Sequence, residues 1–341
     1  MKRKVLLLYT GGTIGMEKDY ESGSLKAFDF SNIASRIPEI SLLDCDVNLH
    51  QFSTPLDSSD VGPEHWSMMA EMIKEHYEDY SGFLILHGTD TMAYTASALS
   101  FMLKGLRKPV ILTGSQLPIG DLRTDAKENL LTALYYASFY DGEEAVVQEV
   151  ALYFEYKLLR GNRCIKASAE NFDAFKTPNY PLLGQSGVNL EAYRNALFRP
   201  SQEEIFEVDT HICKKVFLLW IFPGMNLHAL ENFIQDPPIK VLILGVFGSG
   251  TFFSDKKFED FLFQIRNCGT EIVIISQCMS GEISIGKYDN SNIFKRIGAI
   301  NGRDLTVESA LTKAMHLMDN PRYTEDFKSL FQKNLRGEML N

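Results

Sequence analysis

Cysteine is scarce in this sequence, with five in 341 residues, and no two of them form a C-x-x-C pair. An odd number of scattered cysteines is not a disulfide framework, and closely spaced pairs are the usual mark of zinc and redox sites. The seven histidines also lack His-Glu-x-x-His or a comparable spacing. We therefore expect reduced thiols, as in a cytoplasmic protein, and neither a metal nor another cofactor.

Clustered positive charge and long apolar runs are absent as well. The formal net charge is -10, and lysine and arginine form no block, whereas nucleic-acid binding depends on clustered cations. The longest apolar stretches, such as residues 216–222, fall far short of the roughly 20 residues that cross a bilayer. Residues 5–9 are likewise too short for the apolar part of a secretory signal. We expect no nucleic-acid partner and no membrane partner.

The sequence does contain an alternation of short apolar runs with longer segments of helical periodicity. This alternation is typical of βαβ units around a parallel sheet. It predicts an α/β protein, with a larger N-terminal domain whose mostly parallel sheet is flanked by helices and a smaller C-terminal α/β domain. The expected strands are residues 4–9, 46–52, 83–87, 109–113, 149–155, 215–222, 240–246 and 271–276. The expected helices are residues 63–80, 91–104, 123–140, 226–235, 255–267, 306–318 and 323–335.

The boundary between the two domains is indicated by a loss of periodicity. Polar and charged residues without a clear pattern occupy the stretch that contains Arg199, Pro200 and Ser201. We predict an N-terminal domain at 1–190, a linker at 191–213 and a C-terminal domain at 214–341.

Two loops that follow predicted strands are rich in glycine and threonine, at residues 9–15 (YTGGTIG) and 87–91 (HGTDT). Ligands of parallel sheets bind beyond the carboxyl ends of the strands, and glycine lets the backbone come close to them. By spacing alone the first loop could be a phosphate cradle or a tight turn, although it lacks both G-x-G-x-x-G and a Lys-Ser/Thr ending. The second could be a helix cap, but a cap needs one polar residue and here three stand in a row.

Six short motifs follow one another across nearly the whole chain. They lie at residues 9–15, 57–60, 87–92, 113–116, 160–163 with Lys166, and 277–281. In this order they resemble the bacterial-type L-asparaginases, and among these the cytoplasmic type I group. None of the motifs is specific alone, whereas together they are. The resemblance implies an amidohydrolase that converts the small molecule L-asparagine to aspartate and ammonia without a cofactor, as a homodimer or homotetramer.

The resemblance also implies roles for individual residues. Thr13 would attack the side-chain amide of asparagine and form an acyl-enzyme that water hydrolyses. Because a threonine hydroxyl is a poor nucleophile, it needs a base or a proton relay, and the family's relay matches Thr89, Lys166 and Asp90. Backbone N–H groups near the two threonines would form an oxyanion hole. The implied substrate-binding residues are Gly12, Asp57, Ser58, Ser59, Gly88, Thr89, Asp90 and Ser115.

One departure from the family pattern concerns the segment after the first loop. Members usually carry a catalytic tyrosine in the segment after the first loop, and the simplest alignment places Ser24 there. Tyr20 lies in the same segment and could take this role if the loop folds differently.

Two other functions remain open from the sequence. The same fold could act on glutamine, or serve as the amide-handling subunit of a tRNA amidotransferase, for which an additional domain and a nucleic-acid surface would be expected. A non-catalytic sensor could instead use the two loops to hold a nucleotide or an amino acid. Such a passive site has little use for Lys166, although an isolated lysine is ordinarily a solvated surface residue.

Overall fold

The computed structural model describes residues 2–18, 25–27, 33, 37–231, 239–286 and 291–340. The chain divides into two compact units, Met1–Thr210 and His211–Asn341. Within the stretch that the sequence predicts as a linker, residues 191–213, the short strand β16 (Glu207–Val208) pairs with β6 (Leu103–Lys104). Part of that stretch is thus attached to the first unit.

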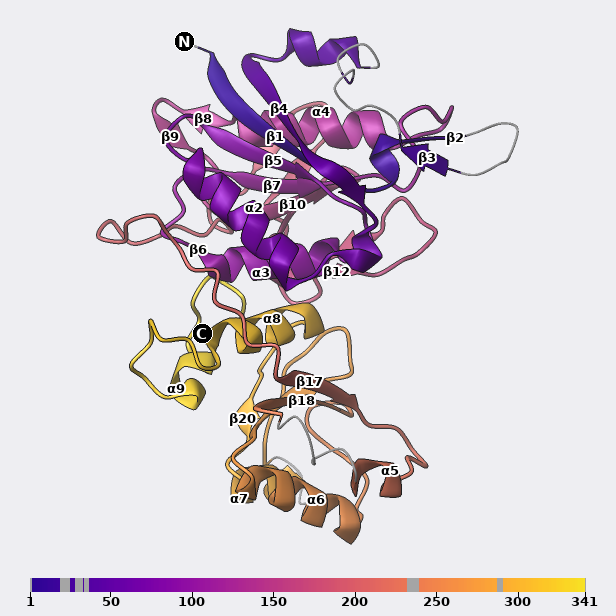
Figure 1. The fold of residues 1–341 in the computed structure, drawn as a ribbon, viewed down its shortest axis with the longest axis vertical. Coiled ribbons are helices and arrows are strands. Elements are labelled where there is room, and N and C mark those ends of the chain that lie inside the picture. Colours follow the sequence, from indigo (N-terminus) through magenta and orange to yellow (C-terminus); the bar gives the residue numbers. More distant parts are fainter. Residues whose placement is uncertain are drawn as a thin grey trace. The chain divides into compact units, whose positions relative to one another are not determined.

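The first unit is built on an eight-stranded sheet (Figure 1) in the order β15-β14-β11-β10-β7-β5-β1-β4. Its parallel part consists of β1 (Arg3–Gly11), β4 (Cys45–Leu56), β5 (Gly82–Leu86), β7 (Val110–Thr113) and β10 (Val150–Phe154). These are the five strands expected from the sequence. The antiparallel edge consists of β11 (Lys157–Arg160), β14 (Gly184–Ser186) and β15 (Leu190–Ala192). The expected α/β architecture is confirmed.

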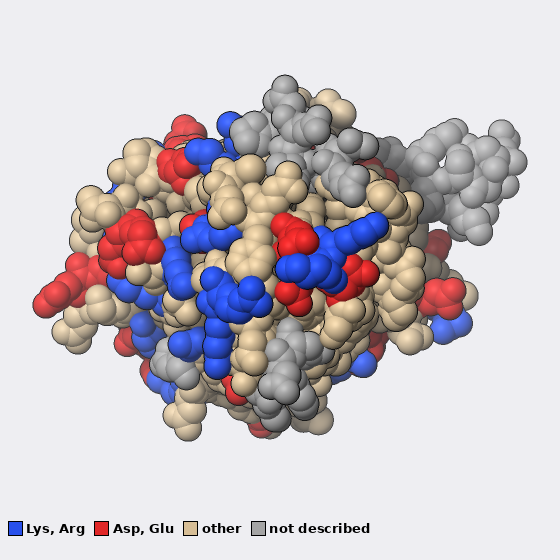
Figure 2. Space-filling view, turned by 90° about the horizontal axis from the view of Figure 1, so that it is seen from below, with Lys and Arg blue, Asp and Glu red and all other residues tan. Residues whose placement is uncertain are grey.

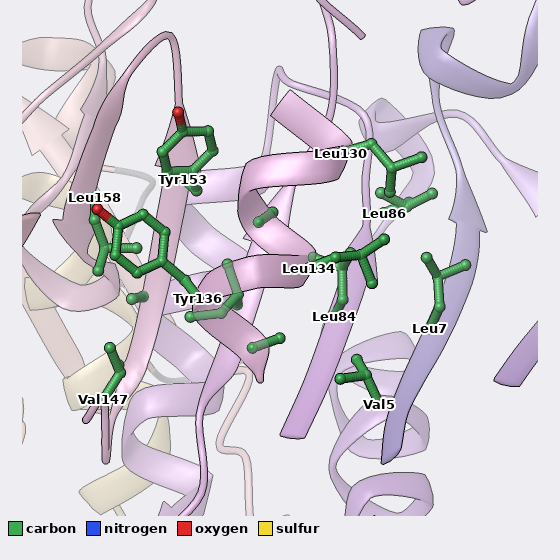
Figure 3. Packing of buried hydrophobic residues seen from close by; sticks show 14 of the residues in the cluster. Val5, Leu7, Leu84, Leu86, Leu130, Leu134, Tyr136, Val147, Tyr153 and Leu158 are labelled. Carbon is green, nitrogen blue, oxygen red and sulfur yellow. The ribbon is translucent and has the colours of Figure 1, made fainter. Parts of the chain in front are cut away.

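One face of this sheet packs against α4 (Ala126–Ala137). Figure 3 shows Leu134 of this helix beside Leu84 of β5, with Leu130 beside Leu86. Side chains alternate along a strand, so the intervening Ile85, which is fully buried, faces the opposite side of the sheet. Both faces of the parallel part are therefore covered, as continuous apolar strands require.

The helices α2 (Pro63–Glu75) and α3 (Met92–Met102) lie on the face away from α4 (Figure 1). The connections from β5 through α3 to β7 and from β7 through α4 to β10 step across the sheet in the same direction. Two right-handed crossovers in one direction would place both helices on the same face. One of these two connections is therefore left-handed, which is rare in parallel sheets.

The second unit has a parallel four-stranded sheet in the order β17-β18-β19-β20. Its strands are β17 (Val216–Trp220), β18 (Val241–Val246), β19 (Glu271–Ser276) and β20 (Ile300–Asn301). Its helices are α5 (His228–Glu231), α6 (Lys256–Asn267), α7 (Asn292–Arg296), α8 (Val307–Leu317) and α9 (Phe327–Phe331). Buried side chains of α6 and of α8 form separate clusters with the sheet, so its two faces are each covered.

Charges of both signs share the surface that Figure 2 displays. Lysine and arginine side chains gather near the middle of this face, and aspartate and glutamate lie among and around them. The net negative charge of the sequence therefore does not produce a uniformly acidic surface on this side. Among the helices of the described ranges, none combines the length and apolar character needed to cross a membrane.

Candidate active site

Three loops meet at the carboxyl edge of the first sheet. Because β1 is parallel to both β4 and β5, the segments that follow these strands leave from the same edge. A Cβ atom added to Gly12 would lie 2.5 Å from the backbone nitrogen of Gly88. A Cβ atom added to Gly88 would lie 2.7 Å from Ser58 Oγ. The loops after β1, β5 and β4 are thus in direct contact, and glycine permits the approach.

Thr13 begins the 3₁₀ turn η1 (Thr13–Gly15) and is partly exposed. Gly12, just before it, has φ of +89°, a conformation that residues with a Cβ rarely adopt. The Gly12 N–H donates to the carbonyl of Leu56 at the end of β4, over 3.2 Å. On the other side, the buried Thr10 hydroxyl donates to the carbonyl of Leu86 over 2.8 Å. The turn that carries Thr13 is therefore anchored to both neighbouring strands.

Lys166 meets two of the predicted site residues. It lies on the two-residue strand β12 (Ile165–Lys166), which pairs with β13 (Phe175–Lys176). Its Nζ donates to Thr89 Oγ1 over 2.8 Å and to Asp90 Oδ1 over 2.5 Å. The lysine side chain is 17% exposed and the Asp90 side chain is 67% exposed. The ammonium group is thus largely covered, while the carboxylate remains accessible to a ligand.

Gln116, which is not among the residues predicted for the site, also contacts Thr89. Its Oε1 lies 3.2 Å from Thr89 Oγ1, while its Nε2 donates to the carbonyl of Asn171 over 3.0 Å. An amide oxygen only accepts, so the Thr89 hydroxyl proton points to Gln116 and an oxygen lone pair faces Lys166. Gln116 directly follows Ser115 in the 113–116 motif, but no local sequence pattern predicts its contact with Thr89.

The loop after β4 holds its side chains in internal hydrogen bonds. Asp57 caps the turn η4 (Ser58–Asp60), accepting from both the backbone nitrogen and the hydroxyl of Ser59 at 2.9 Å. Both bonds lower the pKa of Asp57, and the bond from the Ser59 backbone N–H has the larger effect. The Ser58 carbonyl accepts from the Thr91 hydroxyl over 2.5 Å, and Ser58 is buried against Gly88. Ser58 is therefore packed against the loop that carries Thr89.

The 113–116 segment lies against the 87–92 segment. A Cβ atom added to Gly114 would lie 2.3 Å from the carbonyl oxygen of His87. The Ser115 hydroxyl donates to the carbonyl of Leu117 over 2.6 Å, and Ser115 is almost fully buried. In this conformation its side chain is engaged within its own loop.

His87 lies at the base of the site and is fully buried. Its Nδ1 is 2.7 Å from the carbonyl oxygen of Gly88. Burial lowers the pKa of this imidazole to about 4, so the ring is neutral near pH 7. His87 is thus a neutral, hydrogen-bonded ring beneath the loop that carries Thr89.

Tyr20 and Ser24, the two residues considered for the loop tyrosine, lie outside the described residues. Among the residues that are described, no group of three or more histidine, cysteine, aspartate or glutamate side chains is placed to hold a metal ion.

Both units of the chain match known protein families. The N-terminal asparaginase family model matches residues 4–198, and the glutaminase/asparaginase C-terminal domain model matches residues 215–331. L-asparaginase 1 of Escherichia coli K12 is 41% identical over 339 residues, which cover 99% of this chain and 98% of that protein. The structure of L-asparaginase I from Vibrio cholerae superposes with a TM-score of 0.89 at 36% identity over the whole of both chains. One subunit of the Methanopyrus kandleri glutamyl-tRNA(Gln) amidotransferase is 30% identical, over 98% of this chain and 74% of that protein.

Proposed function

The chain belongs to the asparaginase family, and on that premise we propose that it hydrolyses L-asparagine to L-aspartate and ammonia with Thr13 as the nucleophile. One observation carries the proposal: Lys166 touches both Thr89 and Asp90, in a loop that packs against the loop of Thr13. A hydroxyl, a second hydroxyl and an amine, carried by loops in direct contact and by a lysine bonded to one of them, are the parts that acyl transfer through threonine needs.

In the first half of the reaction, Thr13 Oγ1 forms a bond to the side-chain amide carbon of asparagine. The hydroxyl proton leaves Thr13, and the departing nitrogen gains a proton, so that ammonia is released and an aspartyl ester remains. The Thr89 hydroxyl, which accepts from Lys166, is the group of the described site suited to pass these protons. Lys166 and Asp90 fix its orientation.

In the second half, water attacks the ester carbon and the bond to Thr13 breaks. The proton that water loses returns to Thr13, and aspartate is released. Both halves pass through a negatively charged oxygen, and backbone N–H groups of the Thr13 and Thr89 loops would bind it. Chemical balance requires one water per asparagine and no cofactor.

The charged groups of the substrate have suitable partners in the same loops. The exposed carboxylate of Asp90 would pair with the α-ammonium group, which adds a charge-assisted hydrogen bond. Ser58, from the loop after β4, would bind the α-carboxylate. These contacts fix the distance from the α-carbon to the amide and favour asparagine over glutamine, which is longer by one methylene group.

We further propose that the protein works in the cytoplasm as a homodimer or homotetramer, without nucleic-acid or membrane partners. Its free cysteines support a reducing compartment. The edge strand β17 carries Phe217 and Trp220, which are 38% and 40% exposed, and an exposed apolar edge supports self-association. Light scattering of the purified protein measures the assembly directly.

Ammonia release from asparagine and from glutamine, each over a range of concentrations, tests the proposed reaction. We expect saturable release from asparagine, a lower kcat/KM with glutamine, and no release by Thr13→Ala, whose fold should survive because Thr13 is partly exposed. Thr13→Ser, which retains a hydroxyl, should keep part of the activity. Asparagine binding in calorimetry without any ammonia over hours would instead indicate a sensor, and faster glutamine hydrolysis would change the substrate.

A further inference from the structure

A buried chain of hydrogen bonds runs from α2 to the loop that carries Thr89. Trp66 Nε1 donates to Thr95 Oγ1 on α3 over 3.1 Å. Thr95 Oγ1 lies 2.9 Å from His87 Nε2 at the end of β5. His87 Nδ1 lies 2.7 Å from the Gly88 carbonyl oxygen. Three elements of the first unit thus converge on one peptide group.

The chemistry of the two ends sets the direction of every bond in this chain. An indole N–H can only donate and a carbonyl oxygen can only accept. His87 must therefore carry its proton on Nδ1, facing Gly88, and its bare Nε2 accepts from the Thr95 hydroxyl. The arrangement uses the neutral ring, and the complete burial of His87 and Thr95 disfavours a charged one.

This chain fixes the orientation of the peptide between Gly88 and Thr89. In a trans peptide the C=O and N–H groups point in opposite directions. Since His87 holds the Gly88 carbonyl toward the interior, the Thr89 N–H points the other way, out of the core. Gly88, which shares its loop with Thr89, packs against Gly12 of the Thr13 loop. The Thr89 N–H therefore points into the region where the two threonine loops meet.

We propose that His87 is a positioning residue that, through the Gly88 carbonyl, aims the Thr89 N–H at the substrate oxygen on which negative charge develops. The inference rests on the proposed function, because it assigns that N–H to the oxyanion hole of amide hydrolysis. A donor aimed at the transition state raises kcat, while ground-state binding changes little. His87 itself touches neither the substrate nor the reacting atoms.

The Thr95→Val and Thr95→Ser variants form the matched test. Valine keeps the shape of threonine but leaves both His87 Nε2 and Trp66 Nε1 without their partner, so the ring, and with it the Gly88 carbonyl, is held less firmly. We expect kcat to fall about tenfold with KM within about twofold. Thr95→Ser keeps the hydroxyl and should stay within about twofold of the wild type. Equal kcat in both variants, with a lower Tm for Thr95→Val alone, would reduce His87 to a structural role and overturn the proposal.

A spectroscopic measurement tests the same chain independently of turnover. ¹⁵N NMR of the histidine rings should show His87 neutral, with its proton on Nδ1, from about pH 5 to about pH 9. A proton on Nε2 in the wild type would overturn the proposal even if asparagine is hydrolysed. Conversely, an inactive wild type with the Nδ1 tautomer would refute the proposed function and leave the hydrogen-bond chain intact.

A second pair of variants covers the case in which Thr95→Val does not fold. The amide nitrogen of His87→Asn can occupy the place of Nδ1 and donate to Gly88, whereas His87→Leu offers no donor. We expect His87→Asn to retain at least several times the kcat of His87→Leu at similar KM. Equal kcat for the two would contradict the role assigned to the Nδ1 proton.

Discussion

Lys166 Nζ donates a hydrogen bond to Thr89 Oγ1 over 2.8 Å, although the two residues lie 77 positions apart in the chain. Thr89 follows a central parallel strand, whereas Lys166 belongs to a two-residue strand beyond the antiparallel hairpin of β10 and β11. Their contact joins two regions that no local pattern connects. It is the geometric basis of the proposed proton relay.

Removing the amine should stop turnover without unfolding the protein. We expect Lys166→Met to lower kcat by about 10²- to 10⁴-fold, the usual range for losing a group that assists proton transfer. Its Tm should change little, because an ion pair with an exposed carboxylate contributes at most about 1 kcal/mol. Steady-state kinetics and thermal unfolding check both expectations.

The control for this variant is Lys74→Met, which breaks the exposed pair of Lys74 with Glu71 on α2. It should keep the wild-type kcat. Unchanged turnover in Lys166→Met would remove the lysine from the mechanism.

The Gln116 side chain should assist turnover by holding the Thr89 proton. Gln116→Leu removes the acceptor at 3.2 Å and lets the hydroxyl rotate. A neutral hydrogen bond contributes about 1 kcal/mol, so we expect kcat to fall roughly fivefold. Steady-state or stopped-flow measurement of ammonia release can detect a change in kcat of this size. A kcat equal to that of the wild type would mean that Thr89 is oriented by Lys166 alone.

Gly12 should tolerate no side chain. In Gly12→Ala the new Cβ meets backbone atoms of Gly88, so the loops of Thr13 and Thr89 must separate. We expect at least a tenfold loss of kcat/KM and a lower Tm. Gly142→Ala is the matched control, since Gly142 also has positive φ, +60°, but nothing lies within 4 Å of its added Cβ.

Gly142→Ala should therefore cost only about 1–2 kcal/mol of backbone strain and keep full activity. Comparable kinetics for the two variants would show that the close contact of the two loops is not needed for catalysis.

The buried imidazole of His87 should make stability depend on pH. Its folded pKa of about 4 lies below the ordinary 6.5, so the unfolded chain binds the proton more readily. The free energy of unfolding is therefore highest above about pH 6.5. It decreases by about 3 kcal/mol as the pH falls toward 4. Denaturant unfolding of the wild type and of His87→Asn at several pH values measures it. A constant stability difference between the two proteins across this range would contradict the assignment.

The sequence predicts the parallel part of the fold well because its signals are local. The run before Thr10 and the run before His87 are continuous, apolar and followed by glycine, and both form strands of the central sheet. Helix starts at Pro63 and near Thr91 are likewise marked by single residues. Where periodicity and capping agree, the element appears within a few residues of its expected place.

The missed elements are those that depend on distant partners. The strands β14 and β15 have three residues each, too few for a period, and pair only because β11 provides an edge. The expected helix at residues 323–335 is reduced to α9, which ends at Phe331. The contacts of Gln116 with Thr89 and of His87 with Thr95 also arise from packing between elements, so the sequence offers no sign of them.

Locating the covalent intermediate tests directly whether Thr13 is the nucleophile. The enzyme is mixed with asparagine, quenched in acid during the first turnover, digested and examined by mass spectrometry. We expect a peptide that contains Thr13, heavier by one aspartyl group, with fragmentation placing the ester on the Thr13 oxygen. An aspartyl ester on Thr89 or on any other side chain would contradict this role of Thr13.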